Sequence, residues 1–262
     1  MPAAHGRRVE RTARPTWLAP APRFDYVMTL AMRCAGAVFV AVVFVVSSAA
    51  SYLAFSPERA ARTAFWLLAE GPTVVLATIA AAWAERQGLL RGWMTPRWGD
   101  FTCGLLGALL LFAIAWGFAR AAAPVGSTRE IWLVSLYGQI GDPRELRAHA
   151  GAVATALIVA SAAEEVLWRG MITQLLADRF GSRLAWLWAA GLYAAACVPT
   201  AVALGSSAGP NPVIFLAALG GGLLWGGMAR SFGRLAPGIL AHALFDWAAI
   251  MMFPLWGSTW RR

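Results

Sequence analysis

The chain has 262 residues, of which 59% are hydrophobic and only 13% are charged, with a formal net charge of +9. Soluble domains carry about 25% charged residues, so this composition excludes an ordinary soluble domain. The positive charge comes from arginine alone and lies mostly near the N-terminus and between apolar segments. Such a distribution indicates membrane topology under the positive-inside rule. We therefore expect no nucleic-acid partner.

The apolar segments approach or exceed the length of about 20 residues that a membrane-crossing helix needs. They are predicted at residues 32–55, 64–83, 101–122, 148–176, 184–204, 212–229 and 235–255. Residues 127–147 mix apolar and charged side chains, which predicts a short amphipathic helix in the membrane interface. The sequence thus predicts an all-α, polytopic integral membrane helix bundle with about seven transmembrane helices, surrounded by membrane lipids.

The first 24 residues are rich in arginine and proline and lack the apolar region of a cleavable signal peptide. We interpret residues 1–24 as a cytoplasmic tail that fixes the orientation of the chain. The predicted location is the cell inner membrane, as a multi-pass protein with a cytoplasmic N-terminus.

Two adjacent carboxylates, Glu164 and Glu165, lie inside the fourth apolar segment. Ionisable groups at this depth cost about 2.5 to 3.5 kcal/mol each on insertion and are usually kept for function. Glu165 and Arg169 are four residues apart, so they share a helix face and can neutralise each other. Glu164 points about 100° away from that pair and stays free for chemistry.

Two further pairs of polar residues have helical spacing. His242 and Asp246 lie four apart in the last segment, where the carboxylate can fix the orientation of the imidazole. Tyr193 and Cys197 have the same spacing in the fifth segment. Glu70, in the second segment, either faces the protein interior and contacts the site or lies hydrated near the interface.

These motifs resemble the CPBP intramembrane proteases, the CAAX-processing and bacteriocin-processing glutamic endopeptidases. The family pattern is EExxxR on one helix, then FxxxH, then HxxxN or HxxxD. The chain matches the first motif at residues 164–169 and the last at His242 and Asp246. The middle motif reads Tyr193-Ala-Ala-Ala-Cys197, so tyrosine replaces phenylalanine and cysteine replaces histidine.

The resemblance implies a catalytic core at residues 148–262, preceded by N-terminal membrane helices with the interfacial segment at residues 25–147. It also implies that Glu164 is the general base, while His242 with Asp246 supplies the oxyanion or acid element. The candidate catalytic residues are Glu164, Glu165, Arg169, Cys197, His242 and Asp246. The candidate substrate-binding residues are Tyr193 and Trp168.

The cysteine at the family's histidine position leaves three hypotheses open. In the first, the Cys197 thiol is a nucleophile that forms an acyl-enzyme, which allows transfer to another acceptor and hence protein sorting. In the second, Glu164 alone activates water and Cys197 fills space, as buried cysteines usually do. In the third, catalysis is lost and the protein binds membrane peptides.

The predicted function is therefore an intramembrane endopeptidase for membrane-tethered substrates, such as prenylated proteins or peptides with a C-terminal signal. A catalytically inactive regulator or peptide-binding module is the alternative, followed by a transporter, because buried ionisable groups also build proton relays. No CxxC or HExxH motif is present, so no metal or other cofactor is expected. Zinc bound by Glu164, Cys197 and His242 is the competing chemistry.

Overall fold

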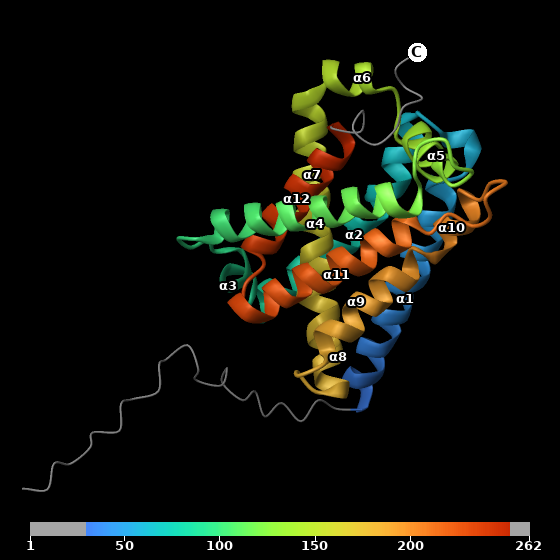
Figure 1. The fold of residues 1–262 in the computed structure, drawn as a ribbon. Helices are drawn as coiled ribbons and strands as arrows, with labels where there is room; N and C mark the ends of the chain where they lie inside the picture. The colour runs from blue at the N-terminus through green and yellow to red at the C-terminus, as the bar shows by residue number, and fades with distance from the viewer. Residues whose placement is uncertain (1–29, 252–262) are drawn as a thin grey trace, which may run out of the picture. The chain divides into compact units, whose positions relative to one another are not determined.

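The computed structural model describes residues 30–251, and the predicted tail at residues 1–24 lies outside them. The chain divides into two units, residues 1–35 and 36–262, and the described part of the first is only the start of helix α1. The first helices are α1 (Leu30–Ala54), η2 (Pro57–Arg59), α2 (Thr63–Arg86), α3 (Leu90–Met94), α4 (Asp100–Ala122), α5 (Glu130–Ile140) and α6 (Pro143–Ala148). The remaining helices are α7 (Ala150–Glu164), η3 (Glu165–Ile172), α8 (Thr173–Phe180), α9 (Ala185–Ala196), α10 (Val198–Ala203), α11 (Val213–Phe232) and α12 (Ala236–Met251) (Figure 1).

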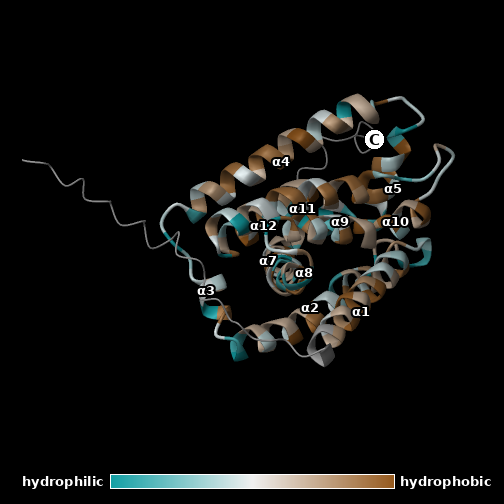
Figure 2. Cartoon of the chain, turned by 90° about the horizontal axis from the view of Figure 1, so that it is seen from below, coloured by the Kyte–Doolittle hydropathy of each residue, from teal (hydrophilic) through white to brown (hydrophobic). Residues whose placement is uncertain are grey.

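Within residues 30–251, six helical stretches are long and apolar enough to cross a membrane, and they coincide with the first six predicted segments. The seventh predicted segment contains α12, a shorter apolar helix whose described part ends at Met251. Large apolar side chains remain exposed on α4, among them Leu106, Leu109 and Ile114, and much of the helix is coloured as hydrophobic (Figure 2). Such a surface is favourable in lipid. The predicted helical membrane bundle is confirmed, and the protein is a multi-pass membrane protein.

The helix that carries the two adjacent glutamates runs through the middle of the bundle. Helices α7, η3 and α8 form one stretch of 31 residues, Ala150–Phe180. Helices α2, α9, α11 and α12 pack around it, as the view along its axis shows (Figure 2). All eight residues of η3 are buried, which requires neighbours on every side of the helix. The centre of the bundle is therefore the place where ionisable groups are best shielded from lipid.

The fifth predicted segment is divided in the structure. Cys197 ends α9 and begins α10, and Pro199 follows in the first turn of α10. Proline has no N–H to donate to the preceding turn, which explains why the helix is interrupted here. The interruption places Cys197 one turn after Tyr193, at the end of α9.

The predicted interfacial helix at residues 127–147 is replaced by two short helices, α5 and α6. Gly141 separates them and has a φ of 135°, which glycine adopts without strain. The Gln139 amide of α5 donates hydrogen bonds to the carbonyls of Ala54 (2.8 Å) and Ser56 (3.0 Å) at the end of α1. These hydrogen bonds hold α5 against the end of α1. The position of α5 in the membrane interface stays a prediction.

Helices α4 and α12 approach each other closely at a glycine. A Cβ atom placed on Gly104 would lie 2.9 Å from the Cβ of Leu240. At the end of this contact the Arg234 Nε donates to both carboxylate oxygens of Asp100, at 3.0 and 3.1 Å. This carboxylate holds the pKa of Arg234 above its ordinary value. The two contacts fix the start of α12, which carries His242.

We expect Gly104→Ala to lower the thermal unfolding temperature in detergent, because overpacking of a close contact costs about 1–3 kcal/mol. Gly117, on the same helix, has open space around its Cβ position. Gly117→Ala is the matched control and should be neutral or stabilising by up to about 1 kcal/mol. Equal unfolding temperatures for the two variants would contradict the close approach of α4 and α12.

Candidate active site

A buried ion pair lies at the middle of the bundle. The Arg169 Nη1 is 3.2 Å from the Glu165 Oε1, and both side chains are almost fully buried. The guanidinium also lies over the Tyr193 ring, 4.5 Å from its centroid, and 5.1 Å from the centroid of Trp225. A buried cation is stabilised by an opposite charge and by aromatic faces. The charges of the predicted pair are thus matched, while the two Nη atoms of Arg169 and the Glu165 Oε2 make no hydrogen bond within the described residues.

The segment after Glu164 is a π-helix, although its spacing was interpreted as α-helical. It runs from Glu165 to Ile172, and the Thr173 hydroxyl donates to the carbonyl of Trp168, five residues earlier, at 2.8 Å. π-Helical turns are rare and occur mostly at functional sites. Nothing in the sequence pattern distinguishes this turn from an ordinary helix.

His242 is held in place from two directions. Its Nδ1 lies 3.1 Å from the Glu165 Oε1, and its ring stacks on Trp225 with centroids 3.6 Å apart and an interplanar angle of 18°. A carboxylate can only accept, so Nδ1 carries the hydrogen and the orientation of the ring is fixed by Glu165. The sequence interpretation gave this role to Asp246, whose Oδ2 lies 3.4 Å from the Nε2 of the ring.

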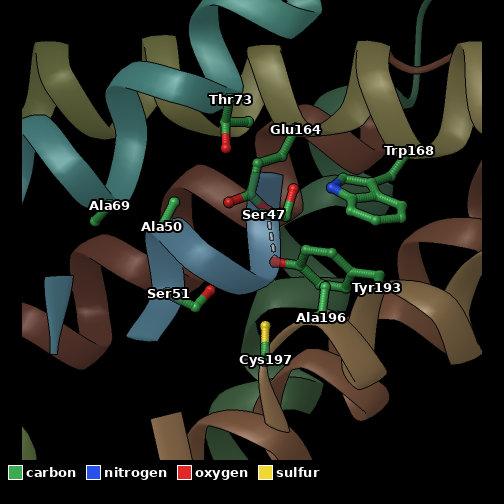
Figure 3. A pocket seen from close by; sticks show the side chains of 10 residues that line it. All are labelled: Ser47, Ala50, Ser51, Ala69, Thr73, Glu164, Trp168, Tyr193, Ala196 and Cys197. Carbon is green, nitrogen blue, oxygen red and sulfur yellow. Dashed lines mark hydrogen bonds between the residues drawn. The ribbon is translucent and has the colours of Figure 1, made fainter. Parts of the chain in front are cut away.

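The Nε2 of His242 faces the general-base candidate. It is 3.9 Å from the Glu164 Oε2. The same Oε2 accepts a hydrogen bond of 2.5 Å from the Tyr193 hydroxyl, drawn as a dashed line in Figure 3. Trp168 packs its ring edge-on against Tyr193, with centroids 5.4 Å apart. Glu164 therefore lies between the imidazole on one side and the phenol on the other.

A small pocket opens beside Glu164, with a cavity volume of about 60 Å³. A water molecule needs roughly 10–15 Å³ on this measure, so the pocket has room for a few water molecules. The residues that line it are Ser47, Ala50, Ser51, Ala69, Thr73, Glu164, Trp168, Tyr193, Ala196 and Cys197 (Figure 3). Both predicted substrate-binding residues, Trp168 and Tyr193, are among them.

The Cys197 sulfur points toward this pocket from the end of α9 (Figure 3). Within residues 30–251 it has no hydrogen-bonded base, since Glu164 is bonded to Tyr193 and His242 to Glu165. A thiol needs such a base, or another source of positive charge, to become a nucleophile. In this arrangement Cys197 is a lining residue of the pocket.

Glu70 belongs to the same region. Its Oε2 is buried and has no hydrogen-bond partner among the described residues, and the charges of Glu164, Asp246 and His242 act on it. Of the two alternatives that the sequence left open, the buried one therefore describes its position.

Two residues of the site were not predicted from the sequence. Trp225 supplies the ring on which His242 stacks, but a tryptophan in an apolar segment of a Trp-rich chain carries no signal of its own. Gly238 lets α12 approach Glu165, because a Cβ there would lie 3.1 Å from the Glu165 Oε2. The spacing of Gly238 and His242, four apart on one helix, was the available hint.

The part of the chain that the structure describes contains no group of three or more His, Cys, Asp or Glu side chains placed to hold a metal ion. The zinc hypothesis, with Glu164, Cys197 and His242 as ligands, gains no support from this geometry. The absence of a cofactor stays a prediction.

The helices and this cluster define a class: a multi-pass membrane protein with a carboxylate–imidazole centre buried inside its helix bundle. Residues 147–248 match the family model described as Type II CAAX prenyl endopeptidase Rce1-like. This match, over residues that include both glutamates, His242 and Asp246, confirms the resemblance derived from the motifs. Comparisons with the curated proteins and with the solved structures found no match.

We expect Glu165→Ala to lower the amount of folded protein in the membrane, because it leaves Arg169 buried without its counter-charge. Breaking a buried pair in this way costs about 3–5 kcal/mol. Glu85→Ala, on the exposed end of α2, is the control and should leave abundance unchanged. Abundance and unfolding temperature in detergent measure the effect, and a Glu165→Ala protein as stable as the control would contradict it.

Proposed function

We propose that the protein is an intramembrane endopeptidase in which Glu164 activates water for hydrolysis of a peptide bond. The observation that carries the proposal is the position of the Glu164 carboxylate. It borders the pocket, accepts the Tyr193 hydroxyl and lies 3.9 Å from the His242 Nε2. The match of residues 147–248 to a CAAX endopeptidase family supports peptidase chemistry at this centre.

In the proposed reaction a water molecule in the pocket gives a proton to Glu164, and its oxygen bonds to the carbonyl carbon of the substrate. His242, protonated on both ring nitrogens, donates its Nε2–H to the oxyanion that forms, and Asp246 beside Nε2 stabilises the imidazolium. When the C–N bond breaks, the proton held by Glu164 passes to the leaving amine. The products are a carboxylic acid and an amine, and the enzyme returns to its starting state. General base catalysis and oxyanion stabilisation each contribute factors of about 10² or more.

The exchange of two residues in the middle motif is consistent with an active centre. The family pattern places a histidine at position 197, where this chain has cysteine. The tyrosine at position 193, where the pattern has phenylalanine, supplies a hydroxyl that bonds to Glu164 instead. The general base thus keeps a polar partner, which now comes from position 193, one helical turn before position 197. This favours catalysis over a purely binding role.

An acyl-enzyme on Cys197 is a second candidate, because the thiol faces the same pocket as Glu164. It would allow the acyl group to be passed to an amine or a lipid instead of water. Because the thiol has no hydrogen-bonded base, we favour hydrolysis by Glu164 over this mechanism.

The proposed substrates are membrane-tethered proteins or peptides, which reach the pocket within or at the surface of the membrane. Helices α1 and α2 supply Ser47, Ala50 and Thr73 to the pocket wall. The predicted N-terminal helices, residues 25–147, would therefore contribute to substrate binding, while residues 148–262 carry the catalytic groups. We keep the inner membrane and a cytoplasmic N-terminus as part of this proposal.

We expect Glu164→Gln and His242→Ala each to abolish processing, because they remove the base and the oxyanion element. The test is comparative proteomics of protein termini in membrane and secreted fractions. It compares wild type, a gene deletion and each variant, with Glu85→Gln as the control. The variants should accumulate the same uncleaved substrates as the deletion. Normal processing by Glu164→Gln protein would contradict the mechanism.

The same experiment with Cys197→Ala separates the two candidates. Hydrolysis by Glu164 predicts processing close to wild type, whereas an acyl-enzyme predicts the pattern of the deletion. If even the deletion changes no terminus, the protein is a binding module.

We also expect Tyr193→Phe to lower kcat by about tenfold or more, since a hydrogen bond to a charged group is worth about 1.5–3 kcal/mol. If the hydroxyl replaces the histidine of the family pattern, the double variant Tyr193→Phe, Cys197→His should recover part of the activity. Cys197→His alone is the control for the added ring. Full activity of Tyr193→Phe would show that the phenol has no role in the reaction.

A further inference from the structure

The proposed mechanism uses Glu164 and leaves a second buried carboxylate, that of Glu70, without a role. Glu70 lies on α2, which packs against α7 and η3. Ala69 and Thr73, which flank it on the same helix, line the pocket beside Glu164 (Figure 3). A carboxylate in this position is adjacent to the reaction centre.

The charges around Glu70 are mostly negative. Arg169 is paired with Glu165, so it does little to neutralise the others. Glu164 on α7, together with Asp246 and His242 on α12, acts electrostatically on Glu70. Glu70 in turn acts on Cys197 of α9. With every carboxyl group ionised, one imidazolium would face the three carboxylates of Glu70, Glu164 and Asp246 in the interior of the bundle.

Such a concentration of negative charge is costly in a low-dielectric interior. Two carboxylates that face each other commonly keep one proton between them, and this arrangement removes the repulsion while leaving one base ionised. The buried Oε2 of Glu70 has no protein partner within the described residues. Buried polar atoms of this kind are usually hydrogen-bonded by water.

We propose that Glu70 and Glu164 share one proton through water between α2 and α7, so that the two carboxyl groups carry a single negative charge. Glu70 is then a positioning residue: it holds the proton, keeps Glu164 ionised as the base and orients the water between them. The catalytic consequence rests on the proposed function, but the shared proton does not.

The test is infrared spectroscopy of the purified full-length protein in detergent at neutral pH, without substrate. Wild type is compared with Glu70→Gln, Glu164→Gln and the matched control Glu85→Gln, an exposed carboxylate on the same helix. We expect a carboxylic-acid C=O band in wild type that is lost in Glu70→Gln, shifted in frequency in Glu164→Gln and unchanged in the control. A wild-type spectrum without such a band, or a band that persists in Glu70→Gln, would overturn the proposal.

Activity measurements with the same proteins separate this inference from the proposed function. We expect Glu70→Gln to lower kcat about tenfold with little change in KM, and Glu70→Asp, which keeps the carboxyl group, to recover part of the loss. The decrease of wild-type activity at alkaline pH, when the shared proton is lost, should move or disappear in Glu70→Gln.

If the infrared band behaves as expected but no preparation cleaves a peptide, the shared proton stands and the peptidase proposal fails. If wild type cleaves and Glu70→Gln changes neither band nor kcat, only the role of Glu70 fails.

Discussion

The site depends on one carboxylate with two partners. The Glu165 Oε1 lies 3.2 Å from the Arg169 Nη1 and 3.1 Å from the His242 Nδ1. A fully buried carboxylate needs such compensation, so this single group joins the central helix to α12. Gly238 permits the approach, because any side chain there would press on the Glu165 Oε2. Once the imidazole is fixed through Nδ1, its Nε2 must face Glu164 and Asp246.

In this arrangement the two adjacent glutamates have different environments. Glu165 is fully buried and paired, so its charge is used for structure, whereas the Glu164 side chain keeps 19% of its surface exposed and borders the pocket. The 100° rotation between neighbouring helical residues produces this difference. Part of the pocket wall comes from α1 and α2, and the site is therefore complete only when these helices and α12 are packed around α7 and η3.

Local spacing explains which features were predictable from the sequence. The membrane helices, the Glu165–Arg169 pair and the common face of His242 and Asp246 all follow from length, hydropathy and a separation of four residues. Contacts between different segments could not be predicted from local spacing. Tyr193 and Glu164 are 29 residues apart and His242 and Glu165 are 77 apart, and no periodicity encodes such pairs. The π-helical turn and the stacking of His242 on Trp225 depend on packing and were missed for the same reason.

In the proposed mechanism the group that contacts Glu164 matters more than the residue type at one motif position. Position 197 lies where α9 ends ahead of Pro199, and its thiol has no hydrogen-bonded base in the described chain. Position 193 lies one turn earlier, inside the continuous helix, where Trp168 and Arg169 hold the Tyr193 ring from two sides. A hydroxyl fixed in this way donates to Glu164, the proposed general base, with little loss of side-chain freedom. The cysteine at position 197, where the family pattern has histidine, therefore leaves Glu164 with a polar contact.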